Sequence, residues 1–290
     1  PVTILGAAMT VTALEAGDLA ITLTSTGAID EDVDNDTADI TTSGTLIMTA
    51  QGAIGATGGD GALDLAVGTL QATTNAGGIF LLDNNALIIG GTGVQTTANN
   101  AAIAITLTAG DLTLDEDITA NGSGTVTLTL STADTAVITS GNADDIASTS
   151  GAITISADRL TLANGNISSS GALVLQPNAS GETIGLGAGA TGGLNLDATE
   201  LGLLTNGFTS ITIGKANSGA VDINAFTFLD PVTILGAAMS VTALEAGNLA
   251  ITLTSTSTID EDVDNTTADI TTSGTLIMTA QGAIGATGGD

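Results

Sequence analysis

Aspartates at alternate positions are the residues of this sequence best placed to do chemistry. Two copies of one acidic run carry them: Asp30, Asp32, Asp34, Asp260, Asp262 and Asp264. Carboxylate oxygens are hard ligands, and alternating acidic residues open the calcium loop of EF-hands. That loop also needs Gly at its sixth position and a bidentate Glu at its twelfth, where this chain has Asn35 and Thr41. We therefore expect either a solvated acidic turn or a low-affinity calcium site, and no other cofactor is required.

Residues 58–64 have a weaker similarity to a calcium-binding sequence. Their glycines and the aspartates Asp60 and Asp64 are arranged like a calcium-binding nonapeptide, but the spacing is one residue out of register. The motif also does not recur in tandem. We expect a Gly-rich turn here.

The scarcity of basic side chains excludes several classes of function. Arg159 and Lys215 are the only cationic side chains, against 31 acidic ones, and the formal charge is −29. Such a charge repels nucleic acid phosphates and anionic membrane surfaces. Acid–base catalysis needs basic or aromatic groups beside acidic ones, and the chain has no His, Cys, Tyr or Trp. We expect neither an enzyme nor a nucleic-acid-binding protein, and no run is apolar enough for insertion into a membrane.

The chain repeats itself over a long period. Residues 231–290 match residues 1–60 at 55 of 60 positions without an insertion or deletion. Residues 1–230 are thus one complete unit, and residues 231–290 are the first quarter of the next. A period this long and this well kept indicates a protein whose role depends on length, because a single site needs no such copying.

Period-two alternation of apolar and small polar residues predicts short strands throughout the unit. The clearest are residues 19–24, 45–49, 103–108, 125–130, 152–156, 173–175 and 210–213. Gly- and Asn-rich turns separate them, and β-branched residues with frequent Gly disfavour helices. The core must be thin, because the chain has four Phe and no larger aromatic residue. With no linker or break in composition, one continuous β-solenoid is favoured over a string of β-sandwich domains.

Three segments carry a resemblance to a known family: residues 151–162, 170–176 and 207–214. Their short strands and Gly/Asn turns resemble the repeats of filamentous-haemagglutinin-type giant bacterial surface proteins. The resemblance implies a right-handed parallel β-helix, export to the cell surface, and a role as adhesin or extracellular fibre. It implies no catalytic residues.

These observations lead to quantitative and functional expectations. Coils of about 20 residues, stacked about 4.8 Å apart, would give 11 or 12 coils and a rise of about 55 Å per unit. We expect a segment of a non-catalytic extracellular filament, sheath or stalk; alternatively, the chain is the stalk of an adhesin whose binding tip lies elsewhere. Its partner would be itself, through head-to-tail or covalently continuous repeats, with lateral bundling through divalent cations.

Overall fold

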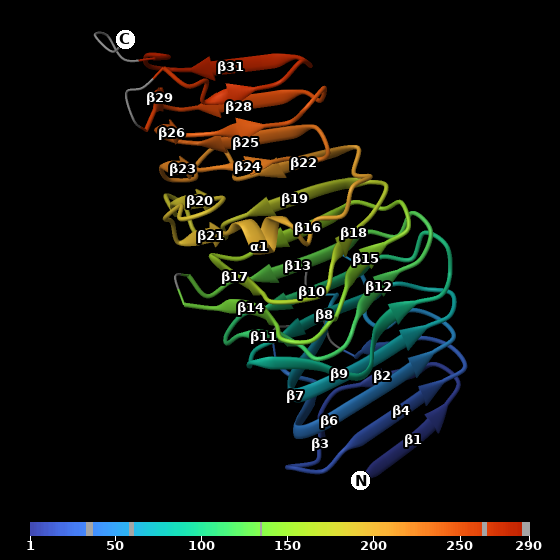
Figure 1. The fold of residues 1–290 in the computed structure, drawn as a ribbon. Coiled ribbons are helices and arrows are strands. Elements are labelled where there is room, and N and C mark those ends of the chain that lie inside the picture. Colours follow the sequence, from blue (N-terminus) through green and yellow to red (C-terminus); the bar gives the residue numbers. More distant parts are fainter. Residues whose placement is uncertain (33–36, 58–60, 134, 263–265, 286–290) are drawn as a thin grey trace.

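The chain winds into a parallel β-solenoid. The computed structural model describes residues 1–290 except 33–36, 58–60, 134, 263–265 and 286–290. In Figure 1 the coils stack from the N-terminus at one end of the molecule to the C-terminus at the other. Throughout the described residues, strands pair in parallel with strands of the next coil. The expected all-β solenoid, continuous through the repeat, is confirmed.

The strands are short except where one strand runs along two sides of a coil. Residues 1–60 contain β1 (Val2–Gly6), β2 (Met9–Val11), β3 (Leu14–Glu15), β4 (Ile21–Ser25), β5 (Ile29–Glu31) and β6 (Ile40–Ala50). The next coils contain β7 (Leu63–Thr74), β8 (Ile79–Asp83), β9 (Leu87–Thr96), β10 (Ile103–Leu107), β11 (Leu112–Leu114), β12 (Ile118–Ala120), β13 (Val126–Leu130), β14 (Val137–Ser140), β15 (Ile146–Ser148), β16 (Ile153–Ser156), β17 (Arg159–Leu162) and β18 (Ile167–Ser168). The rest of the unit contains β19 (Ala172–Gln176), β20 (Ile184–Leu186), β21 (Leu194–Leu196), α1 (Ala198–Leu201), β22 (Ser210–Ile213), β23 (Val221–Ile223) and β24 (Phe226–Thr227). The second copy contains β25 (Val232–Gly236), β26 (Met239–Val241), β27 (Leu244–Glu245), β28 (Ile251–Ser255), β29 (Ile259–Glu261), β30 (Ile270–Thr271) and β31 (Leu276–Ala280).

Alternation along each strand builds the core. In β13, Val126, Leu128 and Leu130 are buried, while the two threonines between them are partly exposed. Equivalent side chains of successive coils stack on one another, so one hydrophobic cluster extends from Ile21 to Ile259. Small aliphatic residues are enough to fill the core, because the interior of the coil is narrow. Each layer of side chains is covered by the layers above and below it.

The coils of the unit can be counted along one column of stacked residues. It runs through nine successive pairings: Met9, Ile29, Ile54, Ile79, Ile103, Val126, Ile153, Leu173, Ile211 and Val232. The expectation of 11 or 12 coils is therefore wrong. The mean coil takes about 25 residues, because many coils have long corners in addition to their three short strands, so the rise per unit is about 45 Å.

The same column shows that the second copy is turned relative to the first. Val232 corresponds in sequence to Val2, yet it stacks in the column that begins at Met9, on the next side of the coil. One 230-residue unit thus makes nine coils and one further side. Internal pairing is nevertheless the same in both copies: Val2 pairs with Ile21, and Val232 pairs with Ile251 in the same register.

Serine and glycine together form a recurring corner. The Ser148 hydroxyl donates to the Gly124 carbonyl at 2.6 Å and accepts from the Gly151 amide at 2.9 Å. One coil further on, Ser169 donates to the Gly151 carbonyl at 2.6 Å and accepts from the Gly171 amide. Each buried hydroxyl thereby satisfies backbone groups of two coils where the chain turns.

Removing one of these hydroxyls should weaken the stack. Ser148→Ala leaves a buried amide and a buried carbonyl without a partner, and we expect a loss of about 2 kcal/mol in unfolding free energy. Urea unfolding followed by circular dichroism measures it. Ser150→Ala, which removes an exposed hydroxyl donating to the Gly122 carbonyl, is the control and should cost less than half as much.

The longest coil, between Leu173 and Ile211, holds an excursion with β20, β21 and α1. Asp197 caps α1 by accepting from the Thr199 and Glu200 amides.

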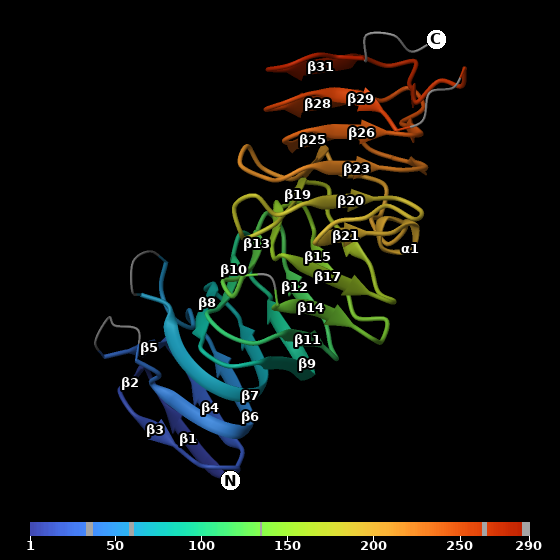
Figure 2. The same ribbon diagram turned by 90° about the vertical axis from the view of Figure 1, so that its left-hand side faces the viewer.

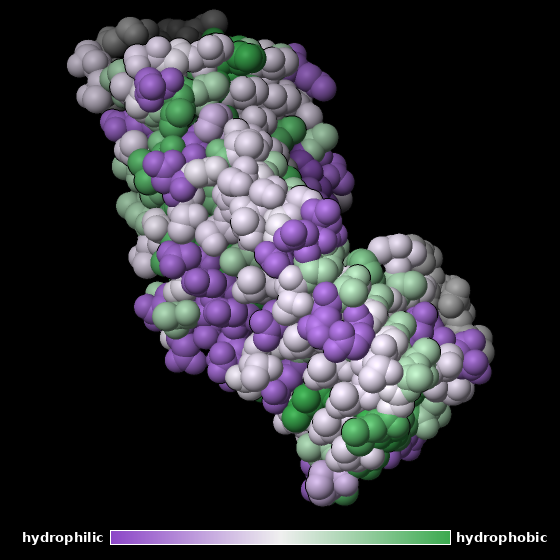
Figure 3. All heavy atoms as spheres, turned by 90° about the vertical axis from the view of Figure 1, so that its right-hand side faces the viewer, coloured by the Kyte–Doolittle hydropathy of each residue, from purple (hydrophilic) through white to green (hydrophobic). Residues whose placement is uncertain are grey.

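Among the residues that the structure describes, no helix has the length and apolar character needed to cross a bilayer. Figure 2 shows that the stack bends, since the coils of β1, β4 and β6 are inclined to those of β25, β28 and β31. Figure 3 shows a largely polar or neutral face with only small hydrophobic groups.

Candidate metal centre

Three buried carboxylates meet where the first acidic run joins the stack. Glu31, Asp39 and Asp64 are 7%, 3% and 3% exposed, and each places a carboxylate oxygen within 4.8 Å of the others. In the part of the chain that the structure describes, no other group of three acidic residues is close enough to hold one ion.

The strands explain why these residues converge. Glu31 ends β5 two positions after buried Ile29, so it lies on the same side of the strand. Asp39 comes directly before β6, and its amide donates to the Asp64 carbonyl at 2.8 Å. Asp64 belongs to β7 in the next coil. The three carboxylates therefore join two coils and the base of the segment 32–38.

The electrostatics of this cluster are unfavourable without a cation. Burial raises the pKa of Asp39, hydrogen bonds with the Asp64 backbone and the Glu31 side chain oppose this shift, and the negative charge of Asp32 raises the pKa further. The Asp39 Oδ2 atom is buried and accepts no hydrogen bond from any described residue. The sequence has no basic side chain before Arg159. Buried carboxylates that lie this close together are stabilised when a cation or a proton reduces their charge.

The aspartates expected from the sequence lie beside this cluster. Asp30 is half-buried, and its Oδ1 atom accepts from the Glu31 amide at 3.1 Å; Asp260 makes the same contact with Glu261. Asp32 and Asp262 are exposed. The remaining two, Asp34 and Asp264, lie outside the described residues.

Sequence reasoning missed all three members of the cluster. The alternation of buried and exposed residues that starts at Ile29 could have predicted that the Glu31 side chain points into the core. The sequence predicted a Gly-rich turn at residues 58–64. This prediction is wrong for Asp64, because Asp64 lies in the long strand β7. Residues 58–60 fall outside the described residues. Asp39 and Asp64 are 25 residues apart, which matches the length of one coil. The expected coil length of about 20 residues hid this relation.

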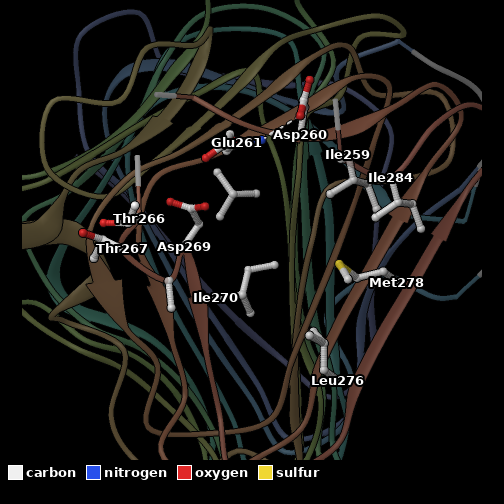
Figure 4. A pocket seen from close by; sticks show the side chains of 13 residues that line it. Ile259, Asp260, Glu261, Thr266, Thr267, Asp269, Ile270, Leu276, Met278 and Ile284 are labelled. Carbon is white, nitrogen blue, oxygen red and sulfur yellow. Dashed lines mark hydrogen bonds between the residues drawn. The ribbon is translucent and has the colours of Figure 1, made fainter. Parts of the chain in front are cut away.

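The second copy presents two of the three carboxylates. Glu261 and Asp269 line a pocket of about 660 Å³ together with apolar residues such as Ile259 and Met278. Figure 4 shows the carboxylates of Glu261 and Asp269 on the pocket side, while Asp260 points away from them. No residue of the sequence corresponds to Asp64 in this copy, because the position falls after Asp290.

Asp83 is a separate, fully buried carboxylate. It accepts from the Val67 amide at 3.2 Å and from the Asn85 amide at 2.7 Å, and burial raises its pKa to about 7. Its column neighbours Leu65 and Leu107 are apolar. With its pKa raised to about 7, this carboxylate can take up a proton near neutral pH.

Comparison with known proteins found no match, whether among family models, curated proteins or solved structures. The fold itself defines the chain as a parallel β-solenoid.

Proposed function

We propose that the chain is a segment of a long extracellular filament, sheath or stalk, built from tandem solenoid units and without catalytic activity. The observation that carries this proposal is the junction between copies. The column through Ile211 continues without interruption into Val232, so the second copy adds to the same core as the first.

The absence of a linker at this junction supports a rod. β24 of the first unit pairs with β27 of the second copy, and β23 pairs with β26, so all three sides of the coil cross the boundary. A solenoid whose coils contact only their neighbours gains length without changing its local packing. A mechanical role follows from such continuity, because length is set by copy number alone.

The surface suits an assembly exposed to salt and divalent cations. The net charge of −29 keeps rods apart at low ionic strength, and carboxylates on neighbouring rods give divalent cations points at which to bridge them. The extracellular setting rests on the family resemblance of the repeats and on this acidic coat.

Chains carrying one, two and three copies of residues 1–230 test the proposal. We expect rods whose length grows by about 45 Å per copy in electron micrographs, since nine coils and one side stack at strand spacing. Small-angle scattering should give a constant cross-section across the series. Growth that follows the square root of copy number, as for compact modules on flexible tethers, contradicts a continuous rod.

A further inference from the structure

We propose that Glu31, Asp39 and Asp64 bind one calcium ion that ties two neighbouring coils together. The carboxylates come from two coils, and all three residues are more than nine-tenths buried. In addition, the Oδ2 atom of Asp39 is buried and accepts no hydrogen bond from a described residue.

Geometry favours calcium over other common ions. Three oxygens within 4.8 Å of one another have a common centre at most about 2.8 Å from each, near the 2.3–2.6 Å of calcium–oxygen bonds. Magnesium demands shorter bonds in a near-octahedral arrangement and gives up its waters reluctantly. Zinc prefers nitrogen and sulfur ligands, and the chain has neither His nor Cys.

Charge gives a second argument. Three carboxylates buried together repel one another, and the chain offers no basic side chain nearer in sequence than Arg159. A divalent ion neutralises most of this charge and holds the two ends of the segment 32–38 against the next coil. Because Glu261 and Asp269 repeat Glu31 and Asp39, the site recurs wherever a counterpart of Asp64 follows a copy.

Calcium titration of the 290-residue chain at pH 7.5 and 0.15 M NaCl, by calorimetry and thermal unfolding, tests the site. We expect one site that prefers calcium to magnesium, and a thermal midpoint that rises with calcium. Asp39→Asn and Asp64→Asn should weaken this site at least tenfold and remove the rise, since ligand charge sets calcium affinity. Each amide keeps the size of its parent and relieves repulsion, so both variants should fold in calcium-free buffer.

Asp269→Asn is the matched control, since it makes the same change in the copy that lacks the third carboxylate. It should leave the tight site and the calcium-dependent midpoint unchanged. Europium(III), used as a calcium probe, should lose more of its coordinated waters on the wild type than on Asp39→Asn, as luminescence lifetimes in H₂O and D₂O report. Calcium binding that survives unchanged in Asp39→Asn overturns the proposal. A wild type whose calorimetric signal and thermal midpoint do not change with calcium also overturns the proposal, and shows that the carboxyls share protons instead.

Discussion

Gly151→Ala should destabilise the centre of the solenoid by about 3 kcal/mol, as expected when a side chain is forced into a packed site. A Cβ atom at Gly151 would overlap the Gly124 carbonyl of the preceding coil, and the backbone there is fixed by the Ser148 corner. The next coil repeats the constraint, because a Cβ atom at Gly171 would meet the Gly151 carbonyl. The close approach of coils, and not an unusual backbone angle, requires glycine at these positions.

Amide hydrogen exchange across residues 120–175 measures this effect locally, together with urea unfolding. Gly141→Ala is the control, because a Cβ atom there meets nothing within 4 Å. We expect that variant to be neutral or slightly stabilising, since alanine restricts the unfolded chain more than glycine does. Equal losses in the two variants would contradict the proposed overlap with the Gly124 carbonyl.

Stability should fall as pH rises from about 4 to about 7, and Asp83 should account for a large part of that fall. Burial raises the pKa of Asp83 from 3.8 to about 7, so the folded chain binds a proton that the unfolded chain has released. The stabilisation is complete below pH 3.8 and is lost as pH rises through 7. The difference amounts to at most about 4 kcal/mol.

Asp83→Asn removes this titration, so its unfolding free energy should change less between pH 4.5 and pH 8 than that of the wild type. Urea unfolding at the two pH values measures the difference. Asp18→Asn removes an exposed carboxylate at a position where the second copy already has Asn248, and it should keep the slope of the wild type. The same slope in Asp83→Asn would show that Asp83 is ionised throughout this range.

Local patterns predicted the strands well, because burial alternates with the pleat. The expected strands at 103–108, 125–130 and 152–156 correspond to β10, β13 and β16, with ends shifted by one residue at most. These segments lie in the regular middle of the unit, where side-chain alternation and turn residues agree.

Coil length was the quantity that local patterns could not supply. Spacing between strands does not reveal which strands lie above one another, and excursions such as residues 177–207 lengthen some coils but not others. The candidate site depended on that length, since Asp39 meets Asp64 only if a coil takes 25 residues. The alternating aspartates lie beside Glu31 and Asp39 in the sequence, but their spacing did not identify the three side chains that are buried together.

The extra side that each unit adds to its nine coils has a consequence for how rods associate. A strand carried once per copy, such as β1 and its counterpart β25, lies on a different side of the stack in the second copy than in the first. In the bundles that we propose, lateral contacts carried by successive copies would therefore face different sides of the rod.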